Sequence, residues 1–213
     1  MTDINTLVNS LEKVKTIRSP YKRSIKWFGL SLALMLIITY AFKYFTQQNM
    51  FAYPLYFYIE NAILTLVAYC AILSAFLYSS PDEQYQLKAK KLAVFCSVFW
   101  IGLFSYCLYH CYSMGHIIHQ LKNAMIDYQN FIEILSIGAI PAIWLILMLR
   151  KAFPTHKRVI GVLTILGSLT LAMVFSRFLD IVYEPTHMII WRYTPVLILA
   201  ILSYWFSDRL LSR

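Results

Sequence analysis

The chain has 213 residues, of which 60% are hydrophobic and 14% charged, and it carries a net charge of +9 at pH 7. This composition is too apolar for a water-soluble domain of that size, and no polar segment is long enough to fold separately. The basic residues follow the gaps between apolar runs instead of forming one stripe, so we infer no direct nucleic acid contact. The composition predicts one integral membrane domain.

Six apolar runs predict six transmembrane helices, because about 20 helical residues at a rise of about 1.5 Å cross a bilayer. The runs are Trp27–Phe45, Pro54–Tyr78, Leu92–Cys111, Phe131–Leu149, Val159–Leu179 and Ile189–Ser207. The gaps are short, so consecutive helices should be antiparallel neighbours in an all-α bundle. We therefore expect a cytoplasmic segment over residues 1–26 and a six-helix transmembrane domain over residues 27–213.

The distribution of basic residues predicts the orientation of the bundle. Fifteen of the 19 Lys and Arg residues lie before the first run, in the second and fourth gaps, or after the last run. The opposite side holds only Lys43, Lys122, Arg177 and Arg192. Because basic residues accumulate on the cytoplasmic side of a membrane, both termini should be cytoplasmic, with the basic residues before the first run at the lipid headgroups.

The N-terminal segment contains an apolar stripe with the spacing of one helical face: Ile4, Leu7, Val8, Leu11 and Val14. Asp3 can cap this helix, and Ser19-Pro20 ends it. A helix of barely three turns is marginal alone in water, so another surface must cover the stripe. The stripe lacks the bulky anchors and strongly basic face of a membrane-surface helix, which favours a groove on a partner protein. The membrane surface and simple disorder remain alternatives.

Charged residues in or next to the predicted spans lie near their outer ends: Glu60, Glu133, Arg177, Asp180, Glu184 and Arg192. Arg177, Asp180 and Glu184 are three and four residues apart, and Arg192 opens the last run. We interpret these four as an ion-pair cluster that joins the last two spans. A proton or ion pathway in a small transporter or channel is the alternative, but it would need charges at mid-depth.

A second group of polar residues combines thiols with imidazoles. Cys107 and Cys111, and likewise His116 and His119, have one-face helical spacing, and His110 lies beside the cysteines. Thiolate and imidazole suit zinc or copper, but no paired CxxC is present, so the sequence indicates no metal or other cofactor. Cys107, Cys111 and His110 remain candidates for sensing, with His116 and His119 as weak candidates for metal ligands.

Patterns that would indicate catalysis are missing from the sequence. There is no P-loop, no HExxH and no GxSxG, so we do not expect an enzyme. A membrane scaffold that presents the N-terminal helix to another cytoplasmic protein is a further alternative to a transporter.

The order of several short motifs resembles the NrsF-like membrane anti-sigma factors. Residues 7–27, reading LVNSLEKVKTIRSPYKRSIKW, are similar to the N-terminal signature of that family. The same order continues with GAIP at residues 138–141, LRKAFP at 149–154 and WRYTP at 191–195. Each motif is loose, but their order and the six-span layout match across nearly the whole chain.

This resemblance implies a protein of the bacterial inner membrane that negatively regulates transcription in a stress response. It would hold an extracytoplasmic-function sigma factor at the membrane until a signal releases it. The N-terminal stripe would be the main sigma-binding element, assisted by the inner loops. Family members often carry a cysteine before the proline of the fourth span and another in the last outer loop. Here those neighbourhoods hold Phe131 and Ile181, so Cys107 and Cys111 would have to replace that pair in any redox or metal sensing.

Overall fold

The computed structural model describes residues 19–46, 53–113, 129–152, 156–179 and 188–212, without the side chains of residues 46, 129 and 130. Within these ranges it contains helices and no strand. The long helices are α2 (Pro20–Thr46), α3 (Leu55–Tyr78), α4 (Glu83–Ser113), α6 (Gln129–Arg150), α7 (Lys157–Leu179) and α9 (Thr194–Leu210). A short π-helical turn, η1 (Ile189–Tyr193), leads directly into α9. All six spans are long and apolar enough to cross a membrane, which confirms the predicted fold class.

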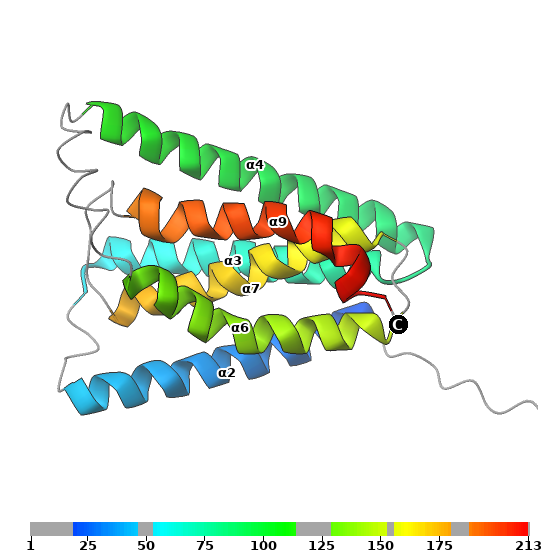
Figure 1. Ribbon diagram of the computed structural model, residues 1–213, viewed down its shortest axis with the longest axis horizontal. Coiled ribbons are helices and arrows are strands. Elements are labelled where there is room, and N and C mark those ends of the chain that lie inside the picture. The colour runs from blue at the N-terminus through cyan, green and yellow to red at the C-terminus, as the bar shows by residue number, and fades with distance from the viewer. Residues whose placement is uncertain (1–18, 47–52, 114–128, 153–155, 180–187, 213) are drawn as a thin grey trace, which may run out of the picture.

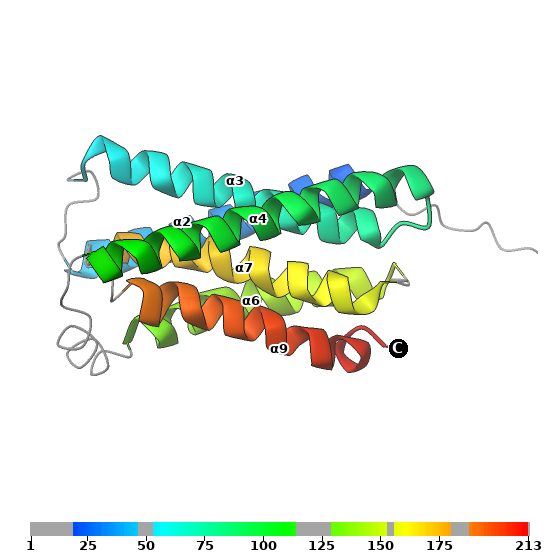
Figure 2. The ribbon, with the colours of Figure 1, turned by 90° about the horizontal axis from the view of Figure 1, so that it is seen from above.

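Successive helices run antiparallel, and α7 is the central helix of the bundle. The helices α2, α4 and α7 begin at the end where α3, α6 and α9 finish (Figure 1). Helix α7 contacts α2, α3, α6 and α9, and the second view shows it between α3 and α9 (Figure 2). Helices α2 and α4 lie at opposite edges, and α4 packs mainly against α3 (Figure 1).

The two ends of the bundle differ in charge. We call the end where α2 begins the basic end, and the other the distal end. The described basic residues near the basic end are Lys22, Arg23, Lys26, Lys88, Lys90, Lys91, Arg150, Lys151, Lys157, Arg158 and Arg209. Those near the distal end are Lys43, Arg177 and Arg192. The asymmetry read from the sequence is therefore an asymmetry of the folded bundle.

The outer surface of the bundle is apolar. In the most apolar stretch of α7, 83% of the residues are buried, against 11% for the most apolar stretch of α4. Val98 and Ile101 of α4, for example, are 64% and 67% exposed. A continuous surface of this kind would be unfavourable in water and is favourable in lipid. The exposed apolar surface therefore indicates that the bundle lies in a membrane.

Small residues allow the neighbours of α7 to approach closely. A Cβ atom on Gly167 would lie 2.7 Å from Ile72 Cγ1 and 3.1 Å from the carbonyl oxygen of Ala68, both in α3. A Cβ on Gly161 would overlap the Ser207 side chain of α9. Lipid gives helices no hydrophobic drive to associate, so close packing at small residues is a main source of stability in membranes.

Two helices begin earlier than the apolar runs predicted. Helix α2 begins at Pro20 instead of Trp27, and α4 begins at Glu83 instead of Leu92. An apolar run marks only the part of a helix that lies in hydrocarbon. The helix itself continues into the polar and basic residues that precede the run. Proline suits the first turn of α2, and Asp82 Oδ1 accepts a hydrogen bond from the Gln84 amide at 2.9 Å at the start of α4.

A buried tyrosine joins α2 to α7 at the distal end. Lys43 Nζ donates to the Tyr53 hydroxyl, which donates to the carbonyl oxygen of Phe178 at 2.8 Å. Lys43 Nζ also lies 4.6 Å from the centroid of the Tyr53 ring, which stacks on Phe57 at 4.4 Å. Burial raises the pKa of Tyr53, so its hydroxyl stays protonated and continues to donate to Phe178.

Replacing Gly167 by leucine should destabilise the bundle, because its side chain would meet both a side chain and the backbone of α3. Overpacking of this kind costs about 1–3 kcal/mol. The measurement is the midpoint of thermal aggregation of the purified protein in detergent. Gly102→Leu is the matched control, since a Cβ at Gly102 meets nothing within 4 Å. Equal midpoints for the two variants would contradict the close packing of α3 and α7.

Tyr53→Phe should also lower stability, because it removes one hydrogen-bond partner from the buried Lys43 ammonium and one from the Phe178 carbonyl. The expected loss is about 1–3 kcal/mol, measured by the same thermal assay. Tyr40→Phe, at a side chain that is 63% exposed, should leave the midpoint unchanged. An unchanged midpoint in Tyr53→Phe would mean that this hydroxyl does not hold α2 against α7.

Candidate functional site

The predicted partner-binding stripe lies outside the described residues. Ile4, Leu7, Val8, Leu11 and Val14 all precede Ser19, the first residue that the structure describes. Their role therefore stays a prediction, and the described site begins where the N-terminal segment enters α2.

The first turn of α2 contacts three other helices. Arg23 donates from NH2 to the carbonyl oxygen of Met148 in α6 at 2.8 Å, and its guanidinium lies 5.1 Å from the Phe76 ring centroid in α3. Tyr21 meets Tyr85 of α4 edge to face, with centroids 5.9 Å apart. Any segment that precedes α2 thus leaves the bundle from a fixed point at the basic end.

A groove of about 450 Å³ lies at the same end of the bundle, between the start of α4 and the start of α7. Its walls include Tyr78 of α3, Leu87 and Lys90 of α4, and His156 before α7. Tyr78 and His156 contact each other with centroids 5.6 Å apart. On the neighbouring surface, Arg158 and Asp208 form an exposed ion pair of the kind that adds little stability. The groove brings polar side chains from the start of α4 and from His156 into one concave surface.

Among the described residues, the distal end holds three buried cations, Lys43, Arg177 and Arg192, whose exposed fractions are 1–2%. Arg177 NH2 donates to Glu60 Oε2 at 2.5 Å, and its guanidinium lies 5.2 Å from the Phe57 ring centroid. The structure thus pairs Arg177 of α7 with a carboxylate of α3. A buried cation with a partner is far less costly than one without, so Glu60 is the group that allows Arg177 to be buried.

The predicted cluster of the last two spans is described only in part. Asp180 and Glu184 lie outside the described residues, while Arg192 is buried in η1. Pro195 follows η1 and has no N–H with which to continue regular helical hydrogen bonding. Tyr193, next to Arg192, is 4% exposed and lies within electrostatic range of Arg177, Arg192, Glu60 and Cys107.

A pocket of about 560 Å³ opens beside the Glu60–Arg177 pair, between α3 and α4, and we call it the distal pocket. Its lining includes Tyr56, Glu60, Tyr106, Cys107, Arg177 and Tyr193. His110 also lines it and contacts Tyr106, with ring centroids 6.3 Å apart. Two residues singled out for sensing, Cys107 and His110, therefore face one cavity together with the ion pair.

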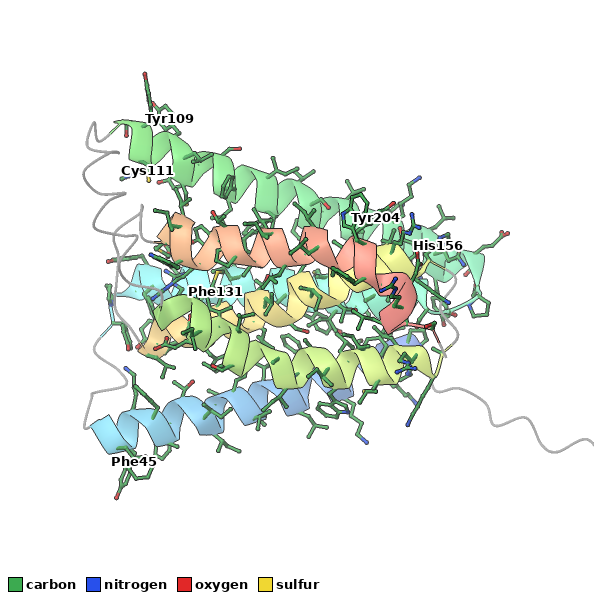
Figure 3. All side chains as sticks on the ribbon, in the orientation of Figure 1. Phe45, Tyr109, Cys111, Phe131, His156 and Tyr204 are labelled. Atoms are coloured by element: carbon green, nitrogen blue, oxygen red, sulfur yellow. The ribbon has the colours of Figure 1, made fainter. Side chains whose placement is uncertain are left out.

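The remaining sensing candidates lie elsewhere or outside the described residues. Cys111 is buried, on the side of α4 that faces the bundle, whereas Tyr109 points away (Figure 3). No disulfide joins the four cysteines, all of which lie in described helices. His116 and His119 are outside the described residues, and the described part of the chain contains no group of three residues suited to a metal ion.

Sequence reasoning noted Glu60 but did not pair it with Arg177. A signal for this pairing was present, because Glu60 opens a span that starts at the outer side and Arg177 closes a span that finishes there. Both side chains were therefore at the same depth. Tyr53 gave no such signal, because an anchoring tyrosine and a hydrogen-bonding tyrosine look alike in a sequence.

Comparison with known families connects this architecture to a regulator. The model of the NrsF family, described as negative regulator of sigma F, matches residues 7–212. Comparisons with curated proteins and with solved structures give no match. The match covers all six helices and most of the N-terminal stripe. The chain therefore belongs to the NrsF family of negative regulators of a sigma factor.

Proposed function

We propose that this protein is a multi-pass anti-sigma factor of a bacterial inner membrane. It holds an extracytoplasmic-function sigma factor through the N-terminal stripe and releases it on a signal. The observation that carries the proposal is the extent of the family match, which begins at Leu7 and continues to residue 212. One chain thus combines the stripe, six membrane-crossing helices and membership of a family of negative regulators.

The distribution of charge along the bundle supports a cytoplasmic position for the stripe. The N-terminal segment joins α2 at the basic end, and basic residues accumulate on the cytoplasmic side of membranes. A sigma factor acts in the cytoplasm, so the stripe lies on the side where its partner is found. The basic side chains at this end, such as Lys22 and Lys26, contact anionic lipid headgroups.

The groove at the basic end supplies a second contact for the sigma factor. It lies at the end of the bundle where α2 begins, and its lining mixes aromatic, aliphatic and charged groups, as partner-binding surfaces do. A sigma factor bound to the stripe would be held close to this groove, where even weak contacts add through high effective concentration.

The positions of the charges in the described helices fit a regulator better than a transporter. Charges within the described helices lie near the helix ends, whereas a transport pathway needs them along its length. A transporter would become the better reading if Arg177→Ala abolished substrate flux at unchanged protein abundance. A scaffold for a different cytoplasmic protein would yield that protein in the same pull-down that we propose for the sigma factor.

The pair of changes Leu7→Asp and Leu11→Asp should abolish sigma-factor capture. Burial of two leucines contributes about 3–6 kcal/mol, so affinity should fall roughly hundredfold or more. The measurement is a pull-down of the full-length protein from solubilised membranes, followed by mass spectrometry. Deletion of residues 2–15 should have the same effect.

Asn5→Asp with Asn9→Asp is the matched control, because it adds the same charge outside the apolar stripe. These changes should leave capture intact. Retention of the sigma factor by the Leu7 and Leu11 variant, at normal abundance in the membrane, would refute the assignment of the stripe.

The basic end should face the cytoplasm. A green fluorescent protein fused after Arg213 should fluoresce, because it folds in the cytoplasm and fails to fold when exported unfolded. Alkaline phosphatase fused after residue 48, beyond α2, should be active, because it requires export. The reverse pattern in the two fusions would place the stripe on the wrong side for a sigma factor.

A further inference from the structure

The distal pocket has no part in holding a sigma factor at the basic end. We propose that it binds an organic cation with an apolar body, such as a quaternary ammonium or phosphonium compound, and that this occupant repositions α4. Three features of the pocket lead to this ligand class: its size, its charge and its aromatic walls. Its place on α4 leads to the regulatory part.

The size and lining of the distal pocket suit a small organic molecule. Its volume of about 560 Å³ lies within the range of about 300–1,000 Å³ that is usual for ligand pockets. Ile63, Leu64 and Leu103 supply apolar walls, and a few polar groups gather at the ion pair. An apolar body with one charged group matches this division.

The charge that the pocket presents is negative. Glu60 has a side chain that is 53% exposed, whereas that of its partner Arg177 is 2% exposed. Arg177 is already engaged by Glu60 and lies over the Phe57 ring, so an anion would have to displace Glu60 to reach it. A cation meets the exposed carboxylate directly, without breaking the pair.

Aromatic rings line the same cavity. Tyr56, Phe99, Tyr106 and Tyr193 come from α3, α4 and η1. Aromatic faces attract cations within about 6 Å, by about 2 kcal/mol when the cation is desolvated. A carboxylate beside several rings is the chemistry that recognises quaternary cations, and it offers little to an anion of the same shape.

A metal ion fits the distal pocket less well than an organic cation. Cys107 and His110 contribute one thiol and one imidazole, but together with Glu60 they do not form a group close enough to hold a metal ion in the described part of the chain. Binding of a metal ion would also make no use of the aromatic rings that line the pocket.

Helix α4 connects the distal pocket to the start of α2, and this regulatory part rests on the proposed function. Phe99, Leu103 and Tyr106 of α4 line the pocket, while Tyr85 in its first turn contacts Tyr21. Helix α4 is the least buried span and is one continuous helix over Glu83–Ser113. An occupant between α3 and α4 therefore shifts Tyr85 against the turn from which the N-terminal segment departs.

The test uses two lipophilic ions of the same shape and opposite charge, tetraphenylphosphonium and tetraphenylborate. Their binding is measured by equilibrium dialysis with the full-length protein in nanodiscs of zwitterionic lipid, corrected with protein-free discs. We expect saturable binding of tetraphenylphosphonium that is roughly tenfold weaker in Tyr106→Leu. Tyr106→Phe, which keeps the ring, should bind as the unchanged protein does.

Tyr109→Leu is the matched control on the same helix, because Tyr109 is 71% exposed and points away from the bundle (Figure 3). It should bind the cation normally. Glu60→Gln should weaken binding as well, and a thermal midpoint measured in parallel shows whether that variant remains folded. Equal or tighter binding of tetraphenylborate, or unchanged binding in Tyr106→Leu, would overturn the site.

The regulatory part is tested by adding tetraphenylphosphonium to the complex with the captured sigma factor. Release from the unchanged protein, with retention by Tyr106→Leu, supports coupling through α4. A bound cation that releases nothing overturns the coupling and leaves the site standing. Failure to capture any sigma factor overturns the proposed function instead, and the dialysis result is unaffected by it.

Discussion

Charge is excluded from the middle of a bilayer, and this constraint arranges the rest of the molecule. It sends most lysines and arginines to one end of the bundle, and it confines Lys43, Arg177 and Arg192 to the other. At the basic end the cations reach water and headgroups, so they need few partners. At the distal end they are buried, and Arg177 requires the carboxylate of Glu60. One end therefore presents exposed basic side chains, whereas the other encloses the distal pocket beside an ion pair.

Packing around α7 solves a different problem, because lipid does not drive helices together. Gly167 brings α3 close enough for contact between backbone and side chain, and Gly161 does the same for α9. Two buried hydroxyls of α7 are satisfied within the helix itself: Thr164 donates to the carbonyl oxygen of Ile160 and Thr170 to that of Leu166. The centre of the bundle is therefore closely packed, while α4 at the edge is the least buried of the described spans.

The spans and the family were predictable because both depend on one-dimensional signals. Apolar runs of sufficient length located six helices, and the starts of α2 and α4 were missed because interfacial residues such as Lys88 are polar but still helical. The Glu60–Arg177 pair joins residues far apart in the chain, so only their common depth pointed to it. The distal pocket had no signal at all, because a cavity is a property of how α3 and α4 diverge.

The length of α4 has a consequence for a protein that lies in a membrane. Its 31 residues extend about 46 Å, well beyond a hydrocarbon layer of about 30 Å. With Lys88, Lys90 and Lys91 placed at the headgroups, a change in bilayer thickness would be accommodated by tilting this helix. Because α4 faces lipid over most of its surface, such tilting meets little resistance from protein. The thickness of the membrane would thus act on the same helix as the cation proposed for the distal pocket.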